Sequence, residues 1–121
     1  MSDTLPAISV TIESGGAGRA IVARPLVKMM DDAALKTLTR LVDESSAAAN
    51  PAIPLVVIDL ARVIILPSLA LGLLVQMSNK CKAREQQLKL VAVQPSVRQV
   101  FAITRLDRIF QFAESVDAAI E

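Results

Sequence analysis

Two short, almost continuously apolar segments constrain the fold of this chain more than any other feature. They are LVVIDL, residues 55–60, and LKLVAV, residues 88–93. Such segments are typical of strands that are covered on both faces, as in the centre of an α/β sheet. Each is followed by a stretch in which apolar residues recur with helical spacing. Strands that alternate with helices in this way predict a mostly parallel sheet with helical crossovers.

The first part of the chain predicts a β-hairpin. Residues 8–12, ISVTI, alternate apolar and polar side chains, which is typical of a strand. The glycine-rich segment SGGAG, residues 14–18, indicates a turn, and the chain returns as a second strand over residues 20–23. Glycines beside a strand can also bind phosphate, but no Lys-Ser or Lys-Thr pair follows and no helix begins there. The hairpin is therefore favoured.

Two long helices are predicted on either side of the first apolar strand. Asp31 or Asp32 can cap the earlier helix, and its inward face is formed by Ala34, Leu38, Leu41 and Val42. The later helix begins at Ser68, directly after Pro67, and runs to about Glu85. Its inward stripe is formed by Ala70, Leu74, Met77 and Cys81.

The C-terminal third predicts a further helix, a short apolar segment and a closing helix. The further helix covers residues 95–106 with Ser96 as its N-cap, and its inward residues are Val97, Val100 and Phe101. The closing helix is capped by Ser115. The complete order is β-β-α-β-α-β-α with a terminal helix. We therefore expect one α/β domain over residues 1–121, with a four- or five-stranded mixed sheet and helices mainly on one face.

Composition excludes several classes of function. The 121 residues contain no histidine and one cysteine, which excludes histidine-based catalysis, histidine-ligated metals, multi-cysteine metal sites and an internal disulfide, so we expect no metal and no cofactor. Three Phe, no Trp or Tyr and a net charge of +1 argue against a nucleic-acid surface. The apolar run over residues 63–75 is too short to span a bilayer, and no secretory signal is visible. We expect a cytoplasmic protein.

The segment VVIDLARVIILPSLALGLLVQM resembles the centre of a STAS domain, the family of anti-sigma-factor antagonists. Val57-Ile58-Asp59-Leu60 matches the family's strand, and Leu71-Gly72-Leu73-Leu74 matches the helix that follows. The later stretch LKLVAVQPSVRQVFAITRLDRIFQFAESVDAAI resembles the family's next strand, helix and closing segment. The resemblance covers residues 53–120 well and implies the STAS fold.

The chain departs from the family at its central motif. Where the family pattern is Asp-Ser-Ser-Gly, this chain has Pro67-Ser68-Leu69-Ala70, although Gly72 is kept. The resemblance places Ser68 at the phosphoacceptor position. Two roles remain open for this serine. It could cap the helix by accepting a backbone N–H, or it could be a switch whose phosphorylation adds about −1.5 to −2 charges to an apolar docking surface.

The helix face opposite the inward stripe predicts a contact surface. It presents Leu69, Gly72, Leu73 and Gln76, and exposed adjacent leucines are typical of a contact site. The predicted partner-binding residues are Pro67, Ser68, Leu69, Gly72 and Leu73. The resemblance implies an anti-sigma factor that is a serine kinase as the partner, with a serine phosphatase that resets Ser68.

Two alternatives to this switch remain. One is a degenerate STAS scaffold that is never phosphorylated and assembles, for example as a homo-oligomer, through its apolar surface. The other is a sensor of a small ligand or nucleotide that uses a groove beside Asp59 and Gly72, because α/β folds place functional groups at strand ends. Asp59 could equally hold the following loop. An enzyme is not expected, since no acid/base pair or nucleophile–base set can be assembled.

Two further features have simple interpretations. Cys81 lies on the inward stripe and is most simply a core thiol, although Lys80 and Lys82 could lower its pKa. The basic residues Lys80, Lys82, Arg84 and Lys89 are interpreted as a solvated helix end rather than a binding site.

Overall fold

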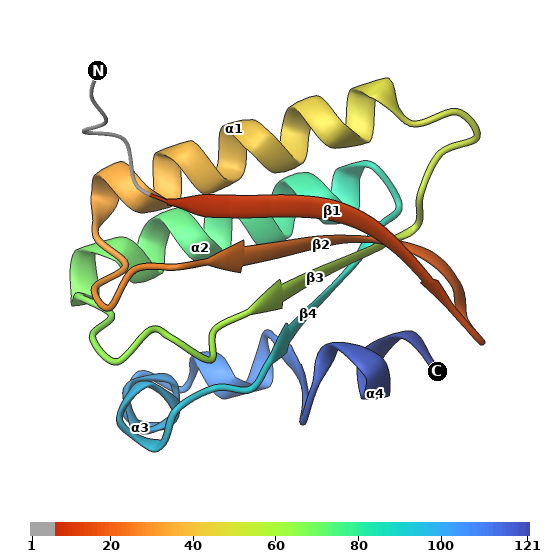
Figure 1. The fold of residues 1–121 in the computed structure, drawn as a ribbon. Helices are drawn as coiled ribbons and strands as arrows, with labels where there is room; N and C mark the ends of the chain where they lie inside the picture. Colours follow the sequence, from red (N-terminus) through yellow and green to blue (C-terminus); the bar gives the residue numbers. More distant parts are fainter. Residues whose placement is uncertain (1–6) are drawn as a thin grey trace.

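The chain folds around one five-stranded sheet (Figure 1), in a computed structural model that describes residues 7–121. The strands are β1 (Ile8–Gly15), β2 (Gly18–Pro25), β3 (Leu55–Asp59), β4 (Gln87–Val91) and β5 (Gln111–Ala113). The helices are α1 (Asp32–Ala48), α2 (Ser68–Ala83), α3 (Pro95–Ile103) and α4 (Val116–Ile120), with a 3₁₀ turn η1 (Leu106–Arg108). The first residues of the predicted 1–121 domain lie outside the described part.

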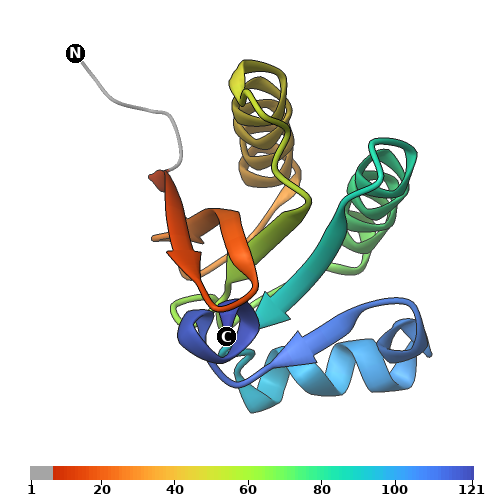
Figure 2. The same cartoon turned by 90° about the vertical axis from the view of Figure 1, so that its right-hand side faces the viewer.

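The strands lie side by side in the order in which they occur in the chain, β1-β2-β3-β4-β5. β1 and β2 pair antiparallel, and every later pair is parallel, so the sheet is mixed as predicted. Helices α1, α2 and α3 provide the crossovers between the parallel strands. The helices are mainly on one face, also as predicted: α1 and α2 lie together on one side, and α4 lies on the other (Figure 2).

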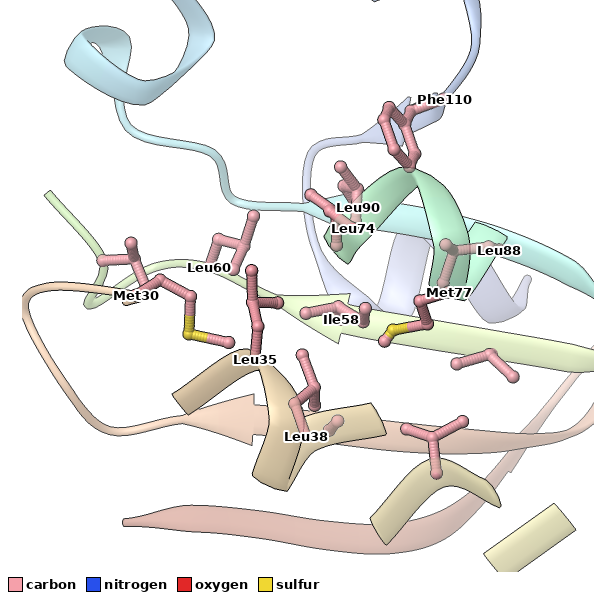
Figure 3. Packing of buried hydrophobic residues seen from close by; sticks show 14 of the residues in the cluster. Met30, Leu35, Leu38, Ile58, Leu60, Leu74, Met77, Leu88, Leu90 and Phe110 are labelled. Atoms are coloured by element: carbon pink, nitrogen blue, oxygen red, sulfur yellow. The ribbon is translucent and has the colours of Figure 1, made fainter. Parts of the chain in front are cut away.

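β3 shows why the LVVID segment is apolar without alternation. Val56 and Ile58 belong to the larger core, which the sheet shares with α1, α2 and α3. Figure 3 shows Ile58 within this core. Leu55 and Val57 point to the opposite face and form a smaller core with α4. All four side chains are buried, so both faces of this central strand are covered.

The α2 stripe is confirmed, because Ala70, Leu74, Met77 and Cys81 are all buried. On α1 the buried residues are Ala34, Leu35, Leu38 and Val42. The prediction that Leu41 faces inward is wrong, because Leu35 is fully buried while Leu41 is only half-buried. Both leucines satisfy helical spacing with Leu38, so periodicity alone could not choose between them.

The C-terminal third differs from the prediction in two details, of which the first is that α3 ends at Ile103 and not at residue 106. The apolar segment before the last helix contains the short strand β5, which pairs with β4 and completes the sheet. Phe101 in α3 contacts Phe110 and Phe112 edge-on, with ring centroids 5.5 and 5.6 Å apart, and this aromatic cluster holds α3 against β5. The predicted cap of the last helix is confirmed, because the Ser115 hydroxyl accepts a 3.0 Å hydrogen bond from the Ala118 N–H.

The glycine-rich segment is the turn of the β1–β2 hairpin and packs against the C-terminal helix. The Ala17 N–H donates to the Ile120 carbonyl at 2.6 Å. A Cβ added at Gly15 would lie 2.4 Å from Cγ2 of Ile120, so only glycine fits this approach. Gly18 has a φ of +105°, a conformation that glycine adopts without strain. These contacts support the hairpin over a phosphate loop.

Candidate interaction site

Two loops meet where strands β2 and β3 end. The loop between β2 and α1 and the loop between β3 and α2 form an isolated parallel bridge, Met29 with Ile65. The Met30 N–H donates to the Ile65 carbonyl at 2.9 Å. The Ile64 and Ile65 N–H groups both donate to the Lys28 carbonyl, at 2.8 and 3.0 Å. Because both loops follow parallel strands, they lie at the same end of the sheet, and these hydrogen bonds hold them together.

Large apolar side chains on these loops are exposed. We call this surface the apolar rim, and its residues are Leu26, Met29, Ile64, Ile65 and Leu69. Leu69, in the first turn of α2, is 82% exposed, which is the largest value among the exposed large hydrophobic residues of the described part of the chain. Exposed apolar residues scattered singly need no explanation, but a group on two joined loops and the adjoining helix turn indicates a contact surface.

Ser68 lies at the start of α2 beside Leu69, and its side chain is exposed. Of the two roles left open for this serine, the structure excludes the cap. Pro67 occupies the N-cap position, Ser68 is the first residue of the helix, and no side chain makes a capping hydrogen bond there. The Ala70 N–H donates to the Pro67 carbonyl at 3.0 Å, but because a proline has no side-chain oxygen, no side-chain cap is available for the first N–H groups of α2.

The other predicted partner-binding residues differ in their exposure to solvent. Gly72 is exposed, and a Cβ added there would meet no heavy atom within 4 Å, so a partner could approach its backbone closely. Leu73, predicted to be exposed, is half-buried against the larger core, because it lies toward the groove between α1 and α2. Pro67 is also half-buried.

Sequence reasoning did not identify Leu26, Met29, Ile64 and Ile65 as site residues. Each belongs to a loop, and the helix periodicity used to find Leu69 does not apply to loops. The available signal was their position, because these large apolar residues lie in the loops that follow two neighbouring parallel strands.

The loop that carries Ile64 is also held by the segment after β4. The Ser96 hydroxyl donates to the Ile64 carbonyl at 3.0 Å, and the Gln94 side-chain amide donates to the Ala61 carbonyl at 2.6 Å. Ser96 was predicted as the N-cap of α3, and this prediction is wrong: Gln94 occupies that position, Pro95 follows it, and no side chain caps the helix. The serine instead positions the apolar rim.

Asp59 ends β3 and holds the loop that follows it. Its Oδ1 accepts a 3.0 Å hydrogen bond from the Ala61 N–H, and its Oδ2 lies 3.7 Å from Nε of Arg24. A small cavity of about 170 Å³ lies beside it, lined by Arg24, Pro25, Leu26, Asp59, Ala61 and Arg62. Gly72 does not line this cavity, so the two residues of the predicted ligand groove are not brought together.

Arg24 is held mainly by Glu13, with Nη1 of the arginine 2.6 Å from the carboxylate. This hydrogen bond, assisted by one from Thr11 and opposed by partial burial, lowers the pKa of Glu13 below its ordinary value. The same bond raises the pKa of Arg24. The arginine is therefore paired with two carboxylates of its own chain, Glu13 and Asp59, which favours a structural role for these three residues.

Cys81 is a core thiol, fully buried, and burial raises its pKa. The four basic residues near it do not form one cluster. Lys80 and Arg84 both pair with Asp43 of α1, at 3.3 and 2.8 Å. Lys89 lies on the opposite face of the sheet, where its ammonium group donates to the Ala119 carbonyl at 3.1 Å.

Within residues 7–121, no group of three or more Cys, Asp or Glu side chains is placed to hold a metal ion. In the same part of the chain, no helix has the length and apolar character that a membrane span requires. The site is thus an exposed apolar surface with one hydroxyl and an uncapped helix start.

Several solved structures of other proteins share this fold. The chain resembles an anti-sigma factor antagonist from Mycobacterium paratuberculosis, with a TM-score of 0.67 and 24% identity over 98% of this chain and 95% of that chain. It also resembles the anti-sigma factor antagonist SpoIIAA in its unphosphorylated form, with a TM-score of 0.66 and 18% identity over 88% and 90% of the two chains. The phosphorylated form of SpoIIAA from Bacillus gives a TM-score of 0.59 at 18% identity, over 88% and 93%. At these identities the likeness establishes a common fold.

The sequence itself gives the family. No curated protein matches it significantly. The model of the STAS domain matches residues 25–119, which is most of the chain and includes the loops of the apolar rim, α2 and the closing segment. The resemblance seen in the sequence is therefore confirmed, and the chain belongs to the STAS domain family.

Proposed function

We propose that this chain is a non-enzymatic interaction module of the anti-sigma-factor-antagonist type. In this proposal the apolar rim, together with Ser68 and Gly72, binds an anti-sigma factor that is also a serine kinase. Phosphorylation of Ser68 releases that partner, and a serine phosphatase restores the bound state. The proposal draws on the family, on solved relatives that are anti-sigma factor antagonists, and on a relative with a phosphorylated form.

One observation carries this proposal: an exposed serine with no capping role stands among exposed apolar side chains. Ser68 is free to accept a phosphate because its hydroxyl makes no cap. Leu69, next to it in the chain, is 82% exposed, and Ile65, three residues before it, is 51% exposed. Such residues can supply the desolvated centre of a protein interface.

The physical effect of a phosphate at Ser68 is local. The uncapped N–H groups of α2 and the positive end of the helix dipole tolerate a negative charge there, so the fold is kept. The apolar surface does not tolerate it, because a charged group buried in an interface without a partner is strongly unfavourable. One modification can therefore abolish binding without unfolding the protein.

The first test is to purify the protein from its own cells, measure its intact mass and map any phosphate. A fraction with one phosphate on Ser68 supports the switch. Protein that stays unmodified across growth and stress conditions contradicts the switch and favours a constitutive scaffold.

The second test identifies the partner by affinity purification and mass spectrometry from the same cells. We expect the wild type to retain an anti-sigma factor with serine-kinase activity. Leu69→Lys and Ser68→Glu should lose it, whereas the control Ile103→Lys should retain it. Ile103 is 73% exposed but lies at the end of α3, away from the apolar rim. Equal losses from Leu69→Lys and Ile103→Lys would exclude the apolar rim as the binding surface.

A further inference from the structure

β1 forms one edge of the sheet, and this edge is long and regular. Its eight residues pair with β2 without interruption, from Ile8 opposite Pro25 to Gly15 opposite Gly18. The other edge strand, β5, has only three residues. Short edge strands are protected against further pairing, whereas a long regular edge presents a row of backbone groups that can pair with another chain.

The sequence of β1 lacks the usual protection against pairing. It contains no proline and no lysine, and its register has no bulge. Its one charged residue, Glu13, is held by Arg24 of its own chain. Ile12, in the middle of the strand, is 51% exposed. Figure 2 shows β1 at the outer side of the sheet, with α1 above one face and α4 below the other.

The register determines which backbone groups point outward. The Leu26 N–H donates to the Ala7 carbonyl at 2.8 Å, so the hydrogen-bonded pairs of the hairpin fall on the odd-numbered residues of β1. The N–H and C=O groups of the even-numbered residues therefore point away from β2, to a side where no strand of residues 7–121 pairs with them. These residues are Ile8, Val10, Ile12 and Ser14.

We propose that this edge binds a second copy of the same chain, with the two β1 strands antiparallel across a two-fold axis at Thr11. In this register Val10 of each chain lies opposite Ile12 of the second copy, and Ile8 lies opposite Ser14. All the outward backbone groups of both strands are then paired. The exposed Ile12 side chain of each copy is covered by Val10 of the other copy. Glu13 faces Ser9 of the second copy, so no like charges oppose each other.

This self-complementarity selects a second copy over an unrelated strand. The same four positions supply both sides of the interface, which is the condition for a symmetric pair. The dimer would contain one continuous ten-stranded sheet. Leu26 of the apolar rim follows the end of β2 that lies beside Ile8. The two-fold axis therefore places the two rims at opposite ends, and both stay free for a partner.

A disulfide tests the register directly in the purified full-length protein. Thr11→Cys places two cysteines opposite each other at the axis, in a non-hydrogen-bonded pair whose Cα atoms lie about 4.5 Å apart. We expect this variant to form a covalent dimer under mild oxidation. Ser9→Cys is the matched control, because Ser9 lies opposite Glu13 of the second copy and not opposite itself. The native Cys81 is buried and should not interfere.

Light scattering after gel filtration, over a range of protein concentrations, tests the assembly without any cross-link. We expect a dimer in the wild type and about a tenfold larger dissociation constant in Ile12→Lys. Leu69→Lys, a substitution in the apolar rim, should leave the dimer intact. A wild type that stays monomeric overturns the proposal. So does a dimer that survives Ile12→Lys but not Leu69→Lys, or one that cross-links through Ser9→Cys and not through Thr11→Cys.

Discussion

The two helices α1 and α2 lie side by side on the same face of the sheet, but they begin in different ways. α1 begins after Asp31, whose carboxylate accepts a 2.9 Å hydrogen bond from the Ala34 N–H, and Asp32 adds a negative charge in its first turn. α2 begins after Pro67, with no side-chain cap and no acidic residue in its first turn. A side chain of the same chain caps the start of α1, whereas no side chain caps the start of α2.

This difference coincides with a difference in exposure. Leu35, in the first turns of α1, is fully buried, and Leu69, in the first turn of α2, is 82% exposed. The hydrogen bonds and apolar contacts that α2 lacks at its start are those that a partner can supply. A functional site is where departures from local rules are expected, because a site that satisfies all its own groups has little left to bind with.

The largest effect that tests this comparison is a change in stability. Leu35→Ala should lower the free energy of unfolding by about 2–5 kcal/mol, because it removes a fully buried side chain and leaves a cavity. Leu69→Ala should change it by less than about 0.5 kcal/mol, since the side chain it removes is mostly in water. Urea denaturation followed by circular dichroism measures both.

The difference in stability between Leu35→Ala and Leu69→Ala is more informative than either value alone. If Leu69→Ala destabilised the protein as much as Leu35→Ala, Leu69 would be packed in solution and the apolar rim would not be a free surface. A partner-binding measurement should show the reverse order, with the larger loss in Leu69→Ala.

An intermediate effect is expected from the two helix starts. Asp31→Ala should cost about 1 kcal/mol, the usual contribution of an N-cap. Ser68→Ala should change the stability by less than about 0.5 kcal/mol, because the hydroxyl makes no capping bond. A loss in Ser68→Ala equal to that in Asp31→Ala would restore the capping role that the structure excludes. Ser115→Ala is a useful positive control, since its hydroxyl does cap α4.

The framework of the fold was predictable from the sequence because periodicity reports burial. The central strand and the α2 stripe from Ala70 to Cys81 were found in this way. Strand β5 was not, because three residues cannot show a period. It is defined by its pairing with β4 and by the cluster around Phe101.

The site was only partly predictable, because its geometry depends on contacts distant in sequence. Ser68 and Ser96 both follow a proline at the start of a helix, and this position makes each a candidate cap. The structure makes neither a cap: the first is exposed, and the second bonds the Ile64 carbonyl from 32 residues away. Only the meeting of the β2–α1 and β3–α2 loops reveals the apolar rim.

The smallest effect concerns charge at the start of α2. Ser68→Glu would give α2 the acidic first turn that α1 has in Asp32, and we expect it to stabilise the protein by about 0.3–1 kcal/mol at low salt. The gain should shrink in 1 M salt, because exposed charges are then screened. Ser68→Gln, similar in size but neutral, is the control, and it should show neither the gain nor the salt dependence. A destabilising, salt-independent Ser68→Glu would mean that α2 cannot accept a negative charge. A phosphate on Ser68 would then act by disturbing the fold and not by changing the surface, and the contrast between the two helix starts would no longer explain a switch.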